Sequence, residues 1–327
     1  MSVAVAVEDT EECLATVVIP VFNGADDHLA ETLAAALHQT VNGAYEVLAI
    51  ESGSTDNSLE ILTRFAAKHP NLRVIEIPNS EFSHGGTRQW AAELANGKYV
   101  AYLSQDAVPA DANWLANMIA GFALADNVGG VLGRQKPRPN CFPLQKHEIN
   151  RAFAAQGPAD QYTVYDAASA DQQTARFYSD VCSAAPRALL LGPLPYRPVK
   201  YAEDQAFGID LIEKGYQKVY AGPATVIHSN DVKLREYGRR MFDEFRGLER
   251  SGIVFGRPSL RQLGKGLLID ARDDAIRARY DGEYSHLRRV YFMVTAPLYR
   301  FARWYGQLRA AHSNSNYSLE AKRKVKA

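Results

Sequence analysis

Short apolar segments alternate with amphipathic segments through the first third of the chain. Runs of apolar and β-branched residues have the length of buried strands, and they cover residues 16–22, 45–50, 72–77 and 99–103. Between these runs, apolar side chains recur every three or four positions, which predicts helices over residues 29–39, 57–68 and up to Leu94. Strands that alternate with helices of this length are typical of βαβ units. We therefore expect an α/β fold built on a mainly parallel sheet.

The pattern is weaker in the middle of the chain and becomes helical at its end. Further helices are expected at 114–122 and 203–214, and further strands at 129–133, 177–185, 218–220 and 224–228. Residues 134–175 show little periodicity, which we interpret as a mobile substrate loop. After Asn230 the sequence is helical and basic, and Pro297 is expected to kink or split the last helix. This change predicts two parts, residues 1–230 and residues 231–327.

Composition indicates a globular protein of the reducing cytosol. The chain has 327 residues, of which 46% are hydrophobic and 23% charged, and this length supports a core without disulfides. Its three cysteines lack metal-ligand spacing. No apolar run reaches the roughly 18 residues of a membrane span. Acidic residues stand at the N-terminus in place of the basic start of a secretory signal, so we expect a cytoplasmic location.

Charge is unevenly placed along the chain. From Tyr284 onward nine lysines and arginines accompany one acid, so this part carries +8 and the first 283 residues carry −8. Such asymmetry predicts an anionic partner. Arginines interleaved with aromatic residues between 288 and 309 suit a helix on the inner face of an anionic membrane. The alternative is a helix packed on the rest of the protein or on a second copy in a homodimer. We expect no nucleic acid, because the basic segment matches no recognition module.

Polar clusters follow several of the predicted strands. They occupy residues 20–24, 51–56, 84–88 and 104–106, and the carboxyl ends of parallel strands form the ligand-binding edge of an open sheet. Asp106 would hold a divalent cation against a diphosphate, or it would only cap the next turn. Gly85 permits close backbone approach, and Arg88 offers a fork of donors for phosphate. The chain lacks both the GxGxxG and the P-loop patterns.

Together these motifs resemble family 2 glycosyltransferases of GT-A fold, and more narrowly the bacterial rhamnosyltransferases. The similarity spans roughly residues 14–230. It rests on the segments Val18–Asn23, Glu51–Ser58, Phe82–Arg88, Ser104–Pro109 and Glu203–Asp204. The resemblance implies that residues 1–230 are a GT-A catalytic domain and that the C-terminal helical, basic region makes acceptor, membrane-surface or dimer contacts.

The resemblance also implies which residues bind the nucleotide sugar. Base and ribose would be held by the ends of the first two strands, and the whole set comprises Pro20, Phe22, Asn23, Glu51, Ser52, His84, Gly85, Arg88, Gln105 and Asp106. Glu51 departs from the aspartate that the family usually carries there. The family's Asp-x-Asp is here Ser104-Gln105-Asp106, so only its second aspartate is present.

The implied cofactor is Mg²⁺ or Mn²⁺, held by Asp106 and His228. A single carboxylate would leave water and diphosphate oxygens to complete the coordination. The other interpretation of His228 is a histidine that simply ends a strand.

The implied reaction is inverting transfer, in which a hydroxyl attacks the anomeric carbon while the nucleoside diphosphate departs. A hydroxyl needs a base at neutral pH, and Asp204 matches the family's position for it, with Glu203 orienting an acceptor or a loop. Without the resemblance, these acids would be read as first-turn residues that favour a helix start. The expected donor is dTDP-L-rhamnose, and the expected acceptor is a cell-surface glycan or its lipid-linked precursor. The alternatives are a UDP- or GDP-sugar donor, and a non-catalytic protein that binds a nucleotide sugar.

Overall fold

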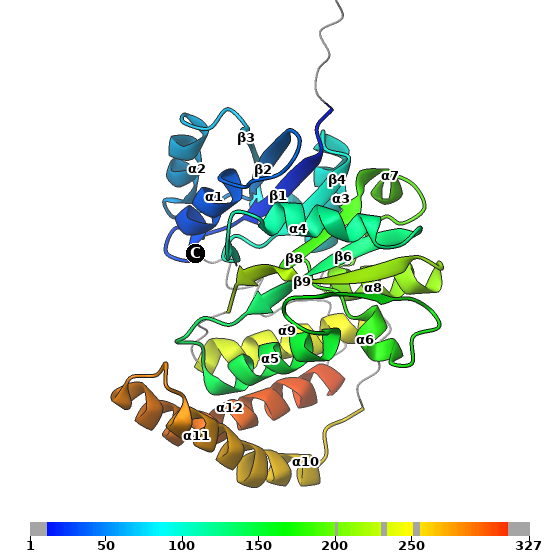
Figure 1. Cartoon of the computed structure of the whole chain (residues 1–327). Helices are drawn as coiled ribbons and strands as arrows, with labels where there is room; N and C mark the ends of the chain where they lie inside the picture. The colour runs from blue at the N-terminus through cyan, green and yellow to red at the C-terminus, as the bar shows by residue number, and fades with distance from the viewer. Residues whose placement is uncertain (1–11, 200–201, 230–233, 251–255, 313–327) are drawn as a thin grey trace, which may run out of the picture.

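The fold is organised around one mixed β-sheet. The computed structural model describes residues 12–199, 202–229, 234–250 and 256–312. Within these residues the sheet has nine strands in the order β3-β2-β1-β4-β8-β6-β9-β5, with β7 paired to β9 (Figure 1). The strands are β1 (Ala15–Val21), β2 (Tyr45–Glu51), β3 (Leu72–Glu76), β4 (Tyr99–Leu103), β5 (Val108–Pro109), β6 (Val128–Lys136), β7 (Tyr162–Tyr165), β8 (Cys182–Pro186) and β9 (Gln217–Ile227).

The first four strands are parallel, as the sequence predicts. β1 pairs with β2 and β4, and β2 pairs with β3. Their sequences are almost continuously apolar because both faces of the sheet are covered. Val17 and Ile19 enter the core on one face, while the intervening Val18 enters the core on the other. The connecting helices are α1 (Leu29–Leu37), α2 (Ser58–Ala66), η1 (Asn79–Glu81) and α3 (His84–Leu94).

The second half of the sheet is mixed. β8 runs antiparallel to both β4 and β6, whereas β6 and β9 are parallel. The two strands expected at 218–220 and 224–228 form the single strand β9, and its pairing with β6 is irregular between Gly133 and Arg134. The helices of this half are α4 (Trp114–Ala120), η2 (Gly121–Ala123), α7 (Arg187–Leu190) and α8 (Glu203–Glu213).

The mobile loop predicted for residues 134–175 is wrong. This stretch contains the end of β6, α5 (Pro143–Gln156), β7 and α6 (Gln172–Arg176). It is held by Lys218 of β9, whose fully buried ammonium donates to Gln156 Oε1 (2.9 Å), the Thr174 carbonyl (2.6 Å) and the Phe177 carbonyl (2.9 Å). The sequence pattern missed these elements because they are anchored by a buried polar residue rather than by a regular apolar stripe.

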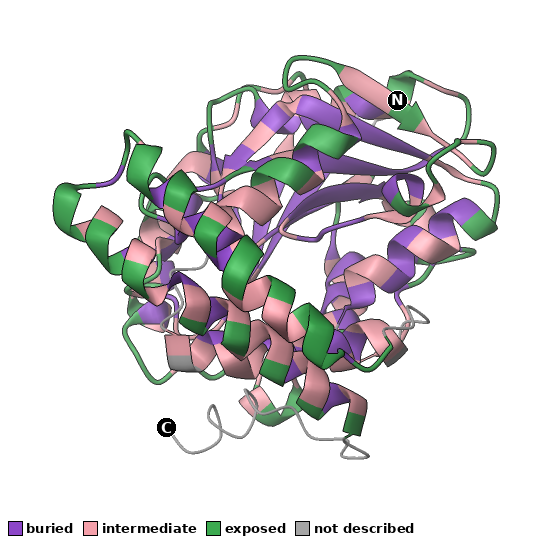
Figure 2. Cartoon of the chain, turned by 90° about the horizontal axis from the view of Figure 1, so that it is seen from below, coloured by how far each residue is buried: buried purple, intermediate pink, exposed green. Residues whose placement is uncertain are grey.

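The C-terminal region is helical, as predicted. It consists of α9 (Leu234–Arg250), α10 (Leu260–Lys265), η3 (Gly266–Asp270), α11 (Ala271–Tyr280) and α12 (His286–His312). In Figure 1 these helices lie on the side of the sheet occupied by α5, with α10 and α11 farthest from β1. α12 is continuous through Pro297, so the predicted split does not occur. Figure 2 shows the strands mostly buried and the exposed residues along the outer sides of the helices.

A third core joins this region to the rest of the chain. It unites Phe142, just before α5, with Tyr237 of α9 and Tyr299 of α12. The Phe142 ring stacks on Tyr299 with centroids 4.7 Å apart. The division of the chain at residue 230 stays a prediction, and this core shows that residues before it pack with the C-terminal helices.

Candidate active site

Three of the predicted strand-end segments contact one another directly. The Phe22 amide donates to Gln105 Oε1 (2.8 Å), and Gln105 Nε2 donates to the Phe22 carbonyl (3.2 Å). Asn23 Oδ1 accepts from the Thr55 amide (2.7 Å), and the Asn23 amide donates to Ser54 Oγ (2.9 Å). Asn23 adopts a left-handed φ of 47°, a conformation that Asn tolerates better than most residues. The ends of β1, β2 and β4 therefore form one connected edge.

The buried carboxylate of Glu51 holds the loop that follows β2 at this edge. It is buried at the end of β2, where Oε1 accepts from the Ser54 amide (2.6 Å) and Oε2 from the Gly53 amide (3.0 Å). Ser52 is also buried, and its amide donates to the Val21 carbonyl (2.9 Å). Each carboxylate oxygen has a second lone pair, so Glu51 retains acceptor capacity for a ligand donor while it fixes the loop. Pro20 and Phe22 are half-buried beside it.

Asp106 and His228 lie side by side beyond the strand ends. His228 Nε2 is 3.4 Å from Asp106 Oδ2, and both side chains are buried. Burial alone would raise the pKa of Asp106, but His228 and the nearby Arg138 outweigh it and lower that pKa. Arg138 also donates through Nη2 to the Asp106 carbonyl (2.5 Å). Burial and the Asp106 charge raise the pKa of Asp27, an acid that sequence analysis did not single out.

Gln135 of β6 orients His228. His228 Nδ1 is 3.0 Å from Gln135 Oε1, and Gln135 Nε2 donates to Ser179 Oγ (3.0 Å). With the amide oxygen facing the ring, Nδ1 carries a hydrogen. Removal of the second ring hydrogen, from Nε2, leaves a lone pair on the nitrogen that lies beside Asp106. A neutral imidazole lone pair beside a carboxylate oxygen is a donor set that fits Mn²⁺.

The two side chains are too few to hold an ion by themselves. Among the residues that the structure describes, no group of three or more His, Cys, Asp or Glu side chains could hold a metal. Asp106 and His228 thus fit a cation whose remaining ligands come from a diphosphate and water.

A second polar cluster, centred on Arg88, is almost completely buried. Arg88 Nη1 lies 2.7 Å from Glu203 Oε1, and Arg88 Nε lies 3.2 Å from Asp180 Oδ2. Asp180 Oδ1 also accepts from Ser183 Oγ (2.7 Å) and from the Tyr196 hydroxyl (2.9 Å). We call Arg88, Asp180, Glu203 and Asp204 the charge cluster.

Asp204 occupies the least neutralised position of the charge cluster. Its Oδ2 accepts from the Asp180 amide (3.3 Å) and its Oδ1 from the Gln205 amide (2.7 Å). Burial raises the pKa of Asp204 well above its usual value, and the charges of Glu203 and Asp180 raise it further. Burial also raises the pKa of Glu203 despite the Arg88 charge. With three carboxylates near one guanidinium, Asp204 is the group best suited to take up a proton.

Two residues of α3 make contacts that the sequence did not predict. The sequence assigned Arg88 to the diphosphate, but its guanidinium is buried and directed at Glu203 and Asp180. Gly85 was expected to admit a ligand; a Cβ there would lie 2.5 Å from the Arg197 carbonyl oxygen, so the protein's own backbone also approaches it closely. Both residues bring α3 against the segment that carries Glu203. His84 is half-buried, with its ring against Phe82 (5.0 Å between centroids).

A continuous chain of contacts joins the two clusters. It runs from Asp106 through His228 and Gln135 to Ser179, which precedes Asp180 of the charge cluster. The Ser104 amide also donates to the Val181 carbonyl (3.2 Å). These contacts connect the Asp106–His228 pair with the charge cluster that contains Asp204.

Sequence analysis missed Gln135, Ser179 and Asp180. Asp180 lies just before β8 (Cys182–Pro186), and because β8 runs antiparallel to β4, its first residues reach the edge where β4 ends. The direction of β8 has no local sequence signal, so only the topology reveals these residues.

A cavity of about 460 Å³ borders Gln135. It is lined by residues of β6 and α5, including Arg134, Asn150 and Phe153, and by Gly157. Gln135 lines the cavity, but neither the Asp106–His228 pair nor any member of the charge cluster does. We therefore place the candidate active site at the strand ends, where the charged groups converge.

The chain matches one family model. The model described as Glycosyl transferase family 2 matches residues 16–189. Two curated relatives are O-antigen chain rhamnosyltransferases: RfbN of Salmonella typhimurium is 28% identical, and WbaN of Salmonella anatum is 30% identical. Each alignment spans 231 residues and covers 70% of this chain and 70% of the relative.

Solved structures show the same fold. The mannosyltransferase PcManGT of Pyrobaculum calidifontis, solved with GDP-Man and Mn²⁺, aligns with a TM-score of 0.58 at 18% identity, covering 93% of this chain and 87% of that one. S. aureus TarS 1–349 with UDP-GlcNAc aligns with a TM-score of 0.53 at 15% identity, covering 95% and 78%. In the described part of the chain, no helix has both the length and the apolar character to cross a bilayer.

Proposed function

Because the chain belongs to glycosyl transferase family 2 and is a glycosyltransferase of GT-A fold, we propose that it transfers L-rhamnose from dTDP-L-rhamnose to a hydroxyl group, with inversion at the anomeric carbon. The observation that carries the choice of sugar is the similarity to two O-antigen chain rhamnosyltransferases over 70% of the chain. The charge cluster, linked to the Asp106–His228 pair, supports a catalytic rather than a purely binding function.

In this proposal the connected edge of β1, β2 and β4 binds the nucleotide. Pro20, Phe22 and Asn23 flank the base, and Glu51 and Ser52 offer acceptors below it. Gln105 holds Phe22 in place through two hydrogen bonds to its backbone. His84 and Gly85 border the sugar side from the start of α3.

Asp106 and His228 hold Mg²⁺ or Mn²⁺ in this proposal. When bound, the cation supplies positive charge to the diphosphate leaving group. Gln135 fixes the tautomer of His228 so that Nε2 faces Asp106, and Arg138 reinforces the position of Asp106 through its carbonyl.

Asp204 is the proposed general base. Its carboxylate takes the proton of the acceptor hydroxyl while the acceptor oxygen bonds to the anomeric carbon. The bond from that carbon to the diphosphate oxygen breaks, and its electron pair leaves with the nucleoside diphosphate. A raised pKa suits this role, because a base is most effective when its pKa lies near the working pH.

Glu203, Asp180 and Arg88 position the base. Arg88 binds both neighbouring carboxylates, and the Asp180 amide donates to Asp204 Oδ2. The negative charges of Glu203 and Asp180 raise the pKa of Asp204. Glu203 is buried against Arg88, so we assign it to this positioning role and not to direct contact with the acceptor.

The proposed acceptor is a cell-surface glycan or its lipid-linked precursor, and the proposed location is the cytoplasm at the inner face of the membrane. The choice of acceptor is supported by the names of the two relatives, which are O-antigen chain rhamnosyltransferases.

The test measures release of nucleoside diphosphate from dTDP-rhamnose, UDP-glucose and GDP-mannose, with and without Mn²⁺. We expect release from dTDP-rhamnose, and a large loss in Asp204→Asn with donor binding retained. Asp210→Asn is the matched control, because Asp210 lies on the same helix but pairs with Arg197 outside the charge cluster. Preference for UDP- or GDP-sugars would refute the proposed donor. Unchanged turnover in Asp204→Asn would remove Asp204 as the base, and binding without turnover would favour a non-catalytic protein.

A further inference from the structure

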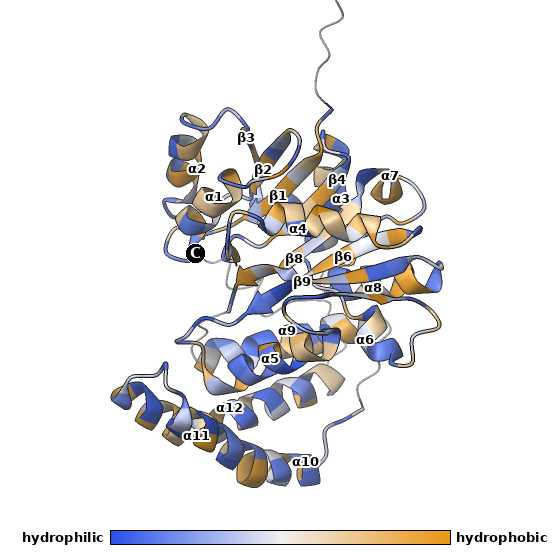
Figure 3. Ribbon diagram, in the orientation of Figure 1, coloured by the Kyte–Doolittle hydropathy of each residue, from blue (hydrophilic) through white to orange (hydrophobic). Residues whose placement is uncertain are grey.

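α12 exposes a regular apolar stripe to solvent. The stripe, which we call the outer seam, repeats at alternating intervals of four and three residues. Its members are Leu287, Tyr291, Val294, Leu298, Phe301 and Tyr305, exposed by 45% to 82%. Figure 3 shows apolar patches on these C-terminal helices among strongly polar ones. Exposed apolar residues also occur on the preceding helical segment, at Leu260, Leu268, Ile269, Ile276 and Tyr280.

The opposite side of α12 is already used for packing. Its buried residues Phe292, Ala296 and Gly306 follow a similar spacing. At Gly306 an added Cβ would lie 2.7 Å from Met241 Cβ of α9, so the two helices approach closely. α12 therefore has two apolar sides. One is buried in the third core, and the other, the outer seam, is exposed to solvent. Contiguous exposed apolar surface of this kind marks an interaction site.

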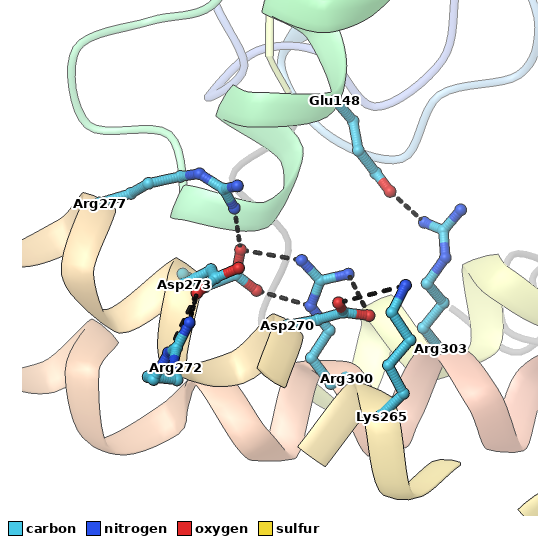
Figure 4. Close-up of polar contacts among 9 residues, drawn as sticks. Glu148, Lys265, Asp270, Arg272, Asp273, Arg277, Arg300 and Arg303 are labelled. Carbon is cyan, nitrogen blue, oxygen red and sulfur yellow. Dashed lines mark hydrogen bonds and ion pairs between the residues drawn. The ribbon is translucent and has the colours of Figure 1, made fainter. Parts of the chain in front are cut away.

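The region around the outer seam is positively charged. Residues 286–312 contain five arginines and no acid, and residues 256–312 contain eleven basic and five acidic residues, a net charge of +6. Two of these arginines are neutralised by acids of other helices. Arg300 pairs with Asp274 (2.6 Å), and Arg303 pairs with Glu148 (2.5 Å), as Figure 4 shows for the second pair. Arg288, Arg289 and Arg309 are the other three arginines of α12. Residues 313–327, outside the described part, add four basic residues and one acid.

We propose that the outer seam is a docking surface for an anionic lipid membrane, on which α12 lies in the plane of the interface. Leu, Val and aromatic side chains on one side of a helix that is rich in arginine and free of acids match the chemistry of interfacial helices. Basic residues add attraction to anionic lipid headgroups. A second copy of the chain complements the surface less well, because it would bring like charges together.

The docking surface is connected to the candidate active site by a short segment. At one end of this segment, Arg138 donates to the carbonyls of Asp106 (2.5 Å) and Ser229 (2.9 Å). At its other end, Arg288 of α12 donates to the Asn140 carbonyl (2.6 Å), and the Tyr284 hydroxyl donates to the Cys141 carbonyl. Residues 138–140 therefore link the backbone carbonyl of Asp106 to Arg288, near the start of α12. Given the proposed function, on which this step rests, docking would bring a lipid-linked acceptor close to the sugar donor.

The test is flotation of the full chain with vesicles of phosphatidylcholine alone or mixed with phosphatidylglycerol. We expect flotation only with the anionic vesicles, and loss of flotation as salt is raised from about 0.1 M to about 1 M. The seam variant is Val294→Glu with Leu298→Glu, which we expect to bind at least about a hundredfold more weakly because two apolar anchors are lost. The matched control is Leu124→Glu with Leu191→Glu, two leucines of similar exposure outside the C-terminal helices.

Flotation of the control but not of the seam variant, with equal thermal stability, would support the proposal. Absence of flotation of the unmodified chain would overturn it, as would equal binding to neutral vesicles. A dimer in analytical ultracentrifugation that the seam variant converts to monomer, without flotation, would assign the surface to a second copy instead. Neither measurement requires donor or acceptor, so failure here is distinguishable from failure of the proposed transfer activity.

Discussion

Replacing Arg88 by Gln tests whether the charge cluster is held as the structure describes. The side chain is buried, and its guanidinium contacts Glu203 (2.7 Å) and Asp180 (3.2 Å). At an effective dielectric constant of about 20, these contacts correspond to gross attractions of about 6 and about 5 kcal/mol. Desolvation offsets much of this sum, but removing one partner leaves the others buried and unpaired, which typically costs about 3–5 kcal/mol.

Protonation of Glu203 limits the share of that cost that comes from its lost partner, and it gives the cost a pH signature. A Glu203 side chain without Arg88 stays folded by taking up a proton, and an unfolded Glu has a pKa of about 4.3. Near pH 7 this uptake costs about 4 kcal/mol, whereas at about pH 5 it costs about 1 kcal/mol. The native variant then binds more protons than its unfolded state, so its stability falls as pH rises. We expect Arg88→Gln to be destabilised by about 4 kcal/mol near pH 7 and by much less near pH 5.

The assay is urea unfolding of the whole chain at both pH values, followed by tryptophan fluorescence. Arg88→Gln combined with Glu203→Gln should recover part of the loss, since contacting residues are not additive. Arg197→Gln is the control, because its pair with Asp210 is partly exposed and such pairs contribute about 1 kcal/mol or less. A loss below about 1 kcal/mol in Arg88→Gln, or an equal loss at both pH values, would show that these charges are not buried together.

Three further predictions concern individual residues. Asp180→Asn should move the acid limb of the pH profile of kcat to lower pH. Burial, Glu203 and then Asp180 raise the pKa of the base Asp204, which must lose its proton before it can act. An acid limb that does not move would exclude Asp180 as a positioning residue. His228→Gln should weaken dTDP binding about 10–100-fold in calorimetry with Mn²⁺ but not without metal, and equal weakening in both conditions would exclude His228 as a ligand. Gly85→Ala should lower stability by about 1–3 kcal/mol because its Cβ meets the Arg197 carbonyl, while Gly264→Ala, with nothing within 4 Å, should raise it by about 1 kcal/mol.

The parallel half of the fold was predictable because its signals are local. Each strand from β1 to β4 is a short apolar run between amphipathic helices, and one face of each helix is buried against the sheet. Residues 134–175 escaped prediction because the order of α5, β7 and α6 depends on Lys218, which lies more than forty residues farther along the chain. Burial of a charged side chain against distant carbonyls leaves no periodic trace in the segment that it anchors.

The candidate site was predictable where strands end and not where topology decides. The contacts of Phe22 with Gln105 follow from parallel pairing, which brings the ends of β1 and β4 together. Arg88 was expected to face a phosphate because a lone guanidinium in a glycine-rich segment carries no sign of its partners. Asp180 reaches it only because β8 returns antiparallel beside β4.

The amide of Gln135 has a direction, and that direction governs what the imidazole beside it can do. With its oxygen toward Nδ1 and its NH₂ toward Ser179, Gln135 keeps a hydrogen on Nδ1, so the neutral form of His228 has its lone pair on Nε2. Rotating the amide by half a turn would present its hydrogens to Nδ1. The hydrogen of the neutral ring would then lie on Nε2 and donate to Asp106, and Nε2 would have no lone pair for a cation. The orientation of one side-chain amide thus decides whether the neutral imidazole offers a lone pair to a cation beside Asp106 or donates a hydrogen bond to Asp106.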